Sequence, residues 1–270
     1  MLDEIDQGEN SLSDFKEELL SQLNKKTSYG YGIDLEEMVN AGLHFGHRLT
    51  NYNPQMKPYI QTIRNSVRII NLEKTAEKLE EALKFIELLI KEKKTVLVIG
   101  TKVQAKNLVG EFAEKTGLPF VNNRWLGGTL TNFEVIKKRI AFLSQLEEGK
   151  ESSDFGKYTK KEQIKFNNKI QKLTTNFGGI RNLEKVPEAI LVLDMRKEAT
   201  AVREARRTGI KLIAVCDTNV NPLLADYPIP ANDDSVSSIK YILDKVAETV
   251  INSRLPAEPA VAPEPAAANS

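Results

Sequence analysis

Residues 95–100 read TVLVIG, a continuous apolar and β-branched run that ends on a glycine. Such a run is typical of a strand buried on both faces, as in a parallel sheet covered by helices. Two further runs have the same character, AILVLD at 189–194 and KLIAVCD at 211–217. We therefore predict that all three are buried parallel strands, and that LPFVNN at 118–123 contains a shorter one.

Helical patterns separate these runs along the chain. The pattern in 72–93 puts Leu79, Leu83 and Ile86 on one stripe, as an amphipathic helix requires. The other segments with helical patterns are 102–117, 197–209 and 238–253. Repeated β-α units predict an α/β fold, a Rossmann-like parallel sheet with helices on both faces.

One long segment interrupts this alternation. Apolar residues recur at a/d spacing in two stretches, first at Phe133, Ile136, Ile140 and Leu143 and then at Phe166, Ile170, Leu173 and Phe177. Thr159 and Glu162 form a capping box that opens the second stretch. The pattern predicts an antiparallel coiled-coil helical hairpin, rich in lysine outside its seam, inserted in the α/β domain.

These patterns divide the chain into four parts. We expect an acidic N-terminal extension at 1–33, a Rossmann-like α/β domain built from 34–128 and 178–254, and the coiled-coil hairpin at 129–177. The Pro/Ala-rich tail at 255–270 has no apolar periodicity, and we expect it to be disordered.

The net charge of +1 conceals an uneven distribution. Residues 1–32 carry a net −4 and residues 256–270 a net −2, which leaves +7 on 33–255. A basic core between acidic ends favours a polyanionic partner such as nucleic acid, although an enzyme for phosphorylated substrates would look similar.

Targeting signals are not evident in the sequence. The acidic start argues against a secretory or transit peptide, and no apolar run approaches the ~18–20 residues that span a bilayer. The single cysteine, Cys216, lies inside an apolar run, where it is a small buried hydrophobe. We expect a cytoplasmic protein without a membrane partner; a plastid-encoded or other organellar copy is an alternative.

Both histidines of the chain, His44 and His47, lie in the stretch HFGHRLTNYNPQMKPYI at 44–60. A zinc site needs three or four ligands, so carboxylates would have to complete one here. Asp194 and Asp217, at the carboxyl ends of predicted strands, are the candidates. We expect no firm metal or cofactor and a structural or contact role for the histidines, with a metal ion bound by these four residues as the alternative.

The turn IGTK at 99–102 resembles a phosphate-binding turn. Neither G-x-x-x-x-G-K-[ST] nor G-x-G-x-x-G is present, however. A nucleotide- or phosphate-dependent enzyme that uses this turn and the strand-end aspartates is the rival hypothesis.

NNRWLGGTLTN at 122–132 contains the only tryptophan, directly after Arg124 and before a glycine pair. We expect Trp125 to anchor the point where the hairpin leaves the sheet, and Arg124 to hold phosphates or sugar edges. Basic residues also alternate with aromatic and amide residues in 48–71, a pattern that suits RNA backbone and unpaired bases.

Several stretches together resemble small-subunit ribosomal protein two of the bacterial or organellar type. They include LEEMVNAGLHFGHRLTNYNPQMKPYI, FVNNRWLGGTLTNF and DYPIPANDDSVSSI, and the resemblance extends in order from about residue 34 to 254. It implies a Rossmann-like domain with a protruding coiled-coil hairpin and a non-catalytic role. It also implies binding to small-subunit ribosomal RNA near the head–body junction, late assembly, and docking of ribosomal protein one in translation.

The implied partners are therefore small-subunit ribosomal RNA and neighbouring ribosomal proteins, including ribosomal protein one, and no homo-oligomer is expected. The residues that we expect to contact RNA are Arg48, Asn53, Lys57, Arg64, Arg68, Lys102, Arg124, Trp125, Lys137, Lys138, Arg139 and Arg181. Two departures from the family pattern stand out. The extension at 1–33 is long, and Asn51, Tyr52 and Gln55 stand where positive charge is common.

Overall fold

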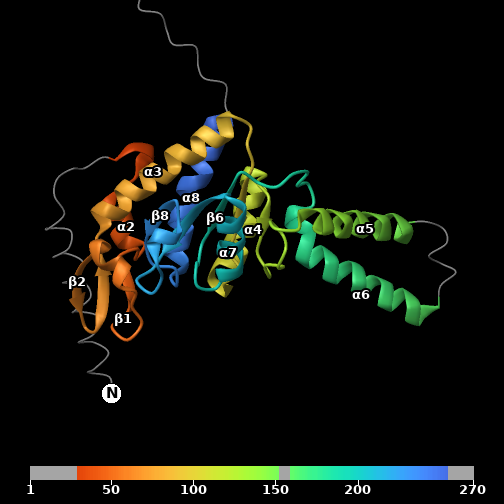
Figure 1. Cartoon of the computed structure of the whole chain (residues 1–270), viewed down its shortest axis with the longest axis horizontal. Helices are drawn as coiled ribbons and strands as arrows, with labels where there is room; N and C mark the ends of the chain where they lie inside the picture. Colours follow the sequence, from red (N-terminus) through yellow and green to blue (C-terminus); the bar gives the residue numbers. More distant parts are fainter. Residues whose placement is uncertain (1–28, 152–158, 255–270) are drawn as a thin grey trace, which may run out of the picture.

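The computed structural model describes residues 29–151 and 159–254. A parallel sheet lies at its centre (Figure 1). It has five strands in the order β5-β4-β6-β7-β8. The strands are β4 (Val96–Ile99), β5 (Phe120–Val121), β6 (Ala189–Val192), β7 (Lys211–Cys216) and β8 (Tyr227–Pro230). The α/β fold class expected from the apolar runs is confirmed.

Alternate residues of each strand enter two separate cores. Val96 and Val98 face one core together with α3 (Leu72–Lys91), α4 (Val103–Thr116) and α8 (Val236–Arg254). Leu97 and Ile99 face the other, which α7 (Ala199–Thr208) and the bases of α5 (Phe133–Glu151) and α6 (Lys160–Phe177) cover. Burial on both faces explains why these strands are continuous apolar runs.

Strand β8 was not predicted, because its sequence YPIP contains two prolines. Proline cannot donate to a sheet ladder and is confined to edges. β8 meets this condition, since it pairs only with β7, in parallel register from Ile213↔Tyr227 to Cys216↔Pro230.

A second, antiparallel sheet was also not predicted. It has the order β1-β3-β2, with β1 (Phe45–Arg48), β2 (Ile60–Arg64) and β3 (Val67–Ile70). Its strands are short, and only Ile69 and Ile70 are fully buried, so the sequence carries no strong alternation. Helix α2 (Leu35–Asn40) precedes this sheet, and the 3-10 helix η2 (Pro54–Tyr59) connects β1 to β2.

Helices α5 and α6 project together from one end of the molecule, and the small sheet lies at the other end (Figure 1). The predicted seam is buried along α5 at Phe133, Ile136, Ile140 and Leu143. Thr159 and Glu162 form the predicted capping box. The two helices are in contact, while coiled-coil packing and the proposed domain limits remain predictions.

The acidic extension at 1–28, the loop at 152–158 and the Pro/Ala-rich tail at 255–270 lie outside the described residues. Cys216 is buried, as expected. None of the helices within 29–151 and 159–254 has the length and apolar character that a membrane span requires.

Candidate nucleic-acid interface

The carboxyl edge of the parallel sheet is where folds of this type bind ligands, at the point where strand order reverses between β4 and β6. Lys102, the last residue of the IGTK turn, lies there among three carboxylates. Its Nζ is 3.3 Å from Asp194, 2.8 Å from Asp233 and 2.7 Å from Asp234. Burial disfavours the charged form of Lys102 and lowers its pKa. The hydrogen bonds to Asp233 and Asp234 together have the larger effect, so the pKa of Lys102 is raised.

The polar groups of Thr101 are also hydrogen-bonded within the protein. Its backbone N–H donates to the buried Glu198 at 3.2 Å, and its hydroxyl donates to the same carboxylate. The turn therefore faces carboxylates that repel a phosphate, and its lysine is neutralised by its neighbours. For this reason Lys102 is unsuited to the RNA contact that we expected from the sequence.

His47 belongs to the same cluster. Its Nδ1 lies 3.0 Å from Asp217 and its Nε2 lies 3.5 Å from Asp234. The hydrogen bond to Asp217 raises the pKa of His47 above its usual value, and burial only partly opposes this. Burial and the charges of Asp217 and Asp194 raise the pKa of Asp233 to about 7. The cluster thus places four carboxylates, those of Asp194, Asp217, Asp233 and Asp234, around Lys102 and His47.

The group that could hold a metal differs from the one expected from the sequence. Among the described residues it is His47, Asp217, Asp233 and Asp234, whose donor atoms all lie within 4.8 Å of one another. His44 and Asp194 do not belong to it. His44 is buried with its ring centroid 4.0 Å from that of Phe45, and burial lowers its pKa to about 4.

The small sheet presents the first group of predicted RNA contacts. Arg48 and Lys57 are exposed. Arg68 lies over the Tyr52 ring at 3.9 Å and donates to the Arg48 carbonyl at 3.3 Å, so part of its side chain is engaged. Arg64 ends β2 at the tight turn to β3, where Asn65 and Ser66 both have positive φ.

Asn53 has a structural role in this region. Its side chain caps η2 by accepting from the Gln55 N–H at 3.0 Å. Its backbone N–H donates to the Thr218 carbonyl at 2.9 Å, which ties the loop to the end of β7.

The second group surrounds the base of the α5–α6 pair. Trp125 is buried, and its indole N–H donates to Glu204 of α7 at 3.1 Å. The same carboxylate accepts from the backbone N–H groups of Gly128, Leu130 and Thr131 at 2.8, 3.1 and 3.2 Å. Trp125 is therefore the packing anchor that we expected, and its buried ring cannot stack on a base.

Burial raises the pKa of Glu204, but these donors, with Gly128 first, outweigh burial and hold it below its usual value. No sequence pattern indicates this role, because Glu204 lies among three arginines in its helix and looks like one more surface charge. Its carboxylate therefore holds the loop 125–131 at the Trp125 side chain and at three backbone N–H groups.

Four predicted basic contacts lie beside this loop. Arg124, Lys138 and Arg139 are exposed. Lys137 is also exposed, and it donates to the Glu184 carbonyl at 3.4 Å. Arg181 is paired with Glu147 at 2.6 Å, so much of its charge is already balanced.

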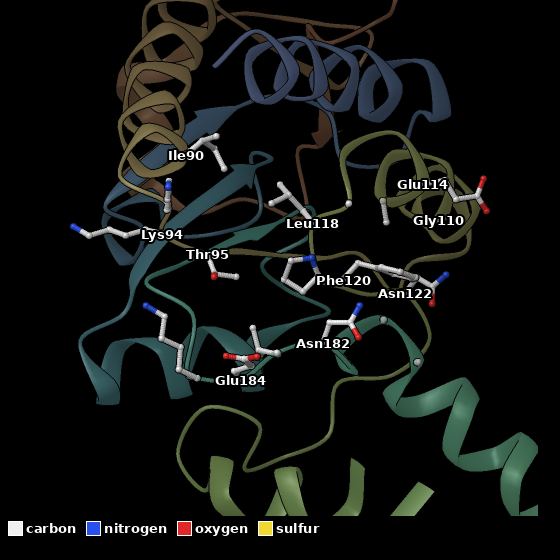
Figure 2. Close-up of a pocket in the computed structure, with 18 of the residues that line it drawn as sticks. Ile90, Lys94, Thr95, Gly110, Glu114, Leu118, Phe120, Asn122, Asn182 and Glu184 are labelled. Atoms are coloured by element: carbon white, nitrogen blue, oxygen red, sulfur yellow. The ribbon is translucent and has the colours of Figure 1, made fainter. Parts of the chain in front are cut away.

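Two cavities in the surface lie near these groups of residues. One of about 890 Å³ lies at the amino ends of β4, β5 and β6, near Thr95, Leu118 and Phe120 (Figure 2). It is lined by lysines but also by Glu114 and Glu184. A cavity of about 510 Å³ lies between Arg124 and helix α6, and includes Lys172.

Comparison with known proteins identifies the family. Residues 38–253 match the family model described as Ribosomal protein S2. The chain is 45% identical to small ribosomal subunit protein uS2 of Petrotoga mobilis over 222 residues, 82% of this chain and 77% of that protein. It is 44% identical to the protein of the same name from Dictyoglomus turgidum over 222 residues, 82% of this chain and 90% of that protein. The chain therefore belongs to the ribosomal protein S2 family.

Proposed function

We propose that this protein is a structural, non-enzymatic component of the small ribosomal subunit and binds small-subunit ribosomal RNA in the cytoplasm. Its relatives are named as small ribosomal subunit proteins, which supports this assignment. One structural observation supports the RNA-binding part: exposed cations lie in two separate places, Arg48 and Lys57 at the small sheet and Lys138 and Arg139 near the base of α5. Figure 1 shows the small sheet and α5 on opposite sides of the parallel sheet.

The electrostatic mechanism follows from this distribution. Arg48 and Lys57 at the small sheet, and Lys138 and Arg139 near the base of α5, would replace counterions condensed on the RNA backbone. Binding should therefore weaken steeply with salt, with the slope set by the number of phosphates neutralised. Two separated surfaces allow one rigid protein to join RNA segments that lie far apart.

The finer assignment rests on the family resemblance. We propose that the protein lies near the head–body junction, joins the subunit late in assembly, and helps to dock ribosomal protein one. Neighbouring ribosomal proteins would be further partners, and the protein would act as a single copy rather than as a homo-oligomer.

A charge-matched comparison tests RNA binding. The variant Lys137→Gln/Lys138→Gln/Arg139→Gln removes three cations from the hairpin base. The control Lys84→Gln/Lys91→Gln/Lys211→Gln removes three lysines that are already paired with Glu80, Glu87 and Asp226. We expect the wild type and the control to co-sediment with small subunits in a gradient, and the first variant to dissociate at lower salt. A wild type that sediments entirely with soluble proteins would refute the proposal.

The rival hypothesis, a nucleotide-dependent enzyme, conflicts with the closed IGTK turn. A nucleotide at about 100 times its dissociation constant would stabilise a binding protein by ~2.7 kcal/mol. We expect no such shift in a thermal denaturation screen with nucleotides, because carboxylates occupy the site where the phosphates would lie.

The metal alternative is retained with the donor set that the structure provides. One imidazole and three carboxylates suit a divalent cation, and zinc accepts such ligands. The ammonium of Lys102 already lies within 2.8 Å of Asp233 and Asp234, so a metal would have to share these carboxylates. Elemental analysis of protein purified without chelators, compared with His47→Ala, measures whether a stoichiometric metal is present and depends on this residue.

A further inference from the structure

Two neighbouring cavities flank the loop that Glu204 fixes. The first, of about 510 Å³, is lined by Arg124 and Leu126 of the loop and by polar residues of α6, namely Asn168, Gln171, Lys172, Thr175 and Asn176. The second, of about 270 Å³, shares Leu126 and continues along the glycine pair to Arg139 of α5. The loop between them is therefore a ridge with a hollow on each side.

The charge of both hollows favours an anion. No aspartate or glutamate lines either of them, whereas Glu114 and Glu184 line the cavity at the amino ends of the strands. Within residues 29–151 and 159–254, the side chains of Arg124, Arg139 and Lys172 form no ion pair. Their charge is thus available to a partner.

Gly127 occupies the ridge without a structural reason of its own. Its neighbour Gly128 has φ +95°, a conformation that side chains rarely adopt. Gly127 is not among the glycines with positive φ, and a Cβ added to it would meet nothing within 4 Å. Neither backbone conformation nor internal packing requires a glycine here, so the bare backbone is free for close approach by an external molecule.

The ridge is rigid enough to serve as a recognition element. Glu204 holds the backbone of Gly128, Leu130 and Thr131, and Asn123 donates to the Thr175 carbonyl at 2.9 Å, joining the loop to α6. Binding would therefore require little ordering of the protein, which favours affinity.

We propose that a nucleotide of single-stranded ribosomal RNA binds here, with its base in the 510 Å³ hollow and its sugar–phosphate backbone crossing Gly127. The amides of Asn168, Gln171 and Asn176 can hydrogen-bond base edges, and recognition of unpaired bases in this way is how proteins read RNA sequence. The cations Arg124 and Lys172 neutralise the adjacent phosphates. This inference rests on the proposed binding to ribosomal RNA and names the site that would carry its nucleotide contact.

The test uses small subunits assembled without this protein as the probe and measures rebinding of the full chain. Gly127→Ala adds one methyl group on the ridge. The matched control Gly110→Ala makes the same change in α4, where the nearest contact of the new Cβ is 3.8 Å away. We expect Gly127→Ala to keep the wild-type melting temperature and to bind about tenfold more weakly, a loss of about 1.4 kcal/mol in the free energy of binding. We expect Gly110→Ala to bind within about twofold of the wild type, because its methyl group is added on α4 and not at the proposed site.

A second variant keeps the test decisive if Gly127→Ala is destabilised. Lys172→Gln changes an exposed side chain, with Lys106→Gln on α4 as its control. We expect Lys172→Gln to weaken binding and to reduce the slope of log affinity against log salt concentration. We expect Lys106→Gln to do neither. Photocrosslinking with 4-thiouridine-labelled RNA should yield crosslinked peptides from 122–132 or 168–176.

The outcomes separate the two proposals. If the wild type fails to rebind, the proposed function is wrong. If the wild type rebinds and both Gly127→Ala and Lys172→Gln match it, the nucleotide site is wrong while the proposed function stands. If these variants bind weakly but no wild-type peptide from 122–132 or 168–176 crosslinks to the labelled RNA, the occupant is not a nucleotide and the nucleotide site is again wrong.

Discussion

Trp125 and Glu204 are 79 positions apart in the chain, yet the indole N–H of one donates to the buried carboxylate of the other at 3.1 Å. This bond attaches the loop before α5 to helix α7 on the same face of the sheet. The carboxylate also holds Gly128, Leu130 and Thr131, so one side chain fixes the segment from which the hairpin helices emerge.

Replacement of this carboxylate should destabilise the protein. In Glu204→Gln, the amide NH₂ would face backbone N–H donors that now point at carboxylate oxygens. Leaving buried donors unsatisfied costs about 1–3 kcal/mol, so we expect a loss of about 2 kcal/mol in the free energy of unfolding, measured by urea denaturation. Glu114→Gln, on the exposed surface of α4, is the control and should change stability little. Equal stability of both variants would contradict the role of Glu204.

Gly46 marks the contact between the two sheets. A Cβ at this position would lie 2.5 Å from the Thr218 methyl group and 2.9 Å from the Arg68 carbonyl. We expect Gly46→Ala to destabilise the protein by about 1–3 kcal/mol through overpacking, as measured by urea denaturation. Gly178→Ala, whose Cβ would lie 3.7 Å from its nearest contact, should be much milder.

His44 should make stability depend on pH. Burial lowers its pKa from 6.5 to about 4, so the folded state binds fewer protons than the unfolded state between these values. The contribution of neutral His44 to the free energy of unfolding is complete above pH 6.5 and is lost as the pH falls towards 4. A pKa shift of this size corresponds to about 3 kcal/mol of that free energy. In urea denaturation at several pH values, His44→Gln should lose less stability over this range than the wild type. Parallel pH profiles would show that His44 is not responsible.

Lys102 should be needed for stability rather than for RNA binding. Lys102→Gln leaves Asp194, Asp233 and Asp234 without their shared ammonium. Breaking a buried ion pair by removing one partner costs about 3–5 kcal/mol. We expect urea denaturation to show a loss of this order, with unchanged affinity for small subunits under conditions where the variant is folded. Weakened affinity in the folded variant would restore Lys102 to the RNA-contacting residues.

The sequence predicted the elements whose pattern is local. TVLVIG, AILVLD and KLIAVCD became β4, β6 and β7, and the a/d spacing located the buried stripe of α5, because burial on a regular helix or strand leaves a periodic trace. Strand β8 and the small sheet left no such trace, since one consists of prolines alternating with larger residues at an edge and the other of short, half-exposed strands.

The candidate site residues also divide into those that the sequence predicted and those that only the structure revealed. From sequence alone, Arg124, Lys138 and Arg139 could be selected as basic residues near a glycine pair, and family membership could be recognised from ordered motifs. Only the tertiary structure showed that Lys102 is enclosed by three aspartates, that Glu204 holds the loop, and that Arg124 and Lys172 line one hollow. Charge type is a property of a residue, but whether the charge is free depends on partners brought near it by folding, which no local pattern specifies.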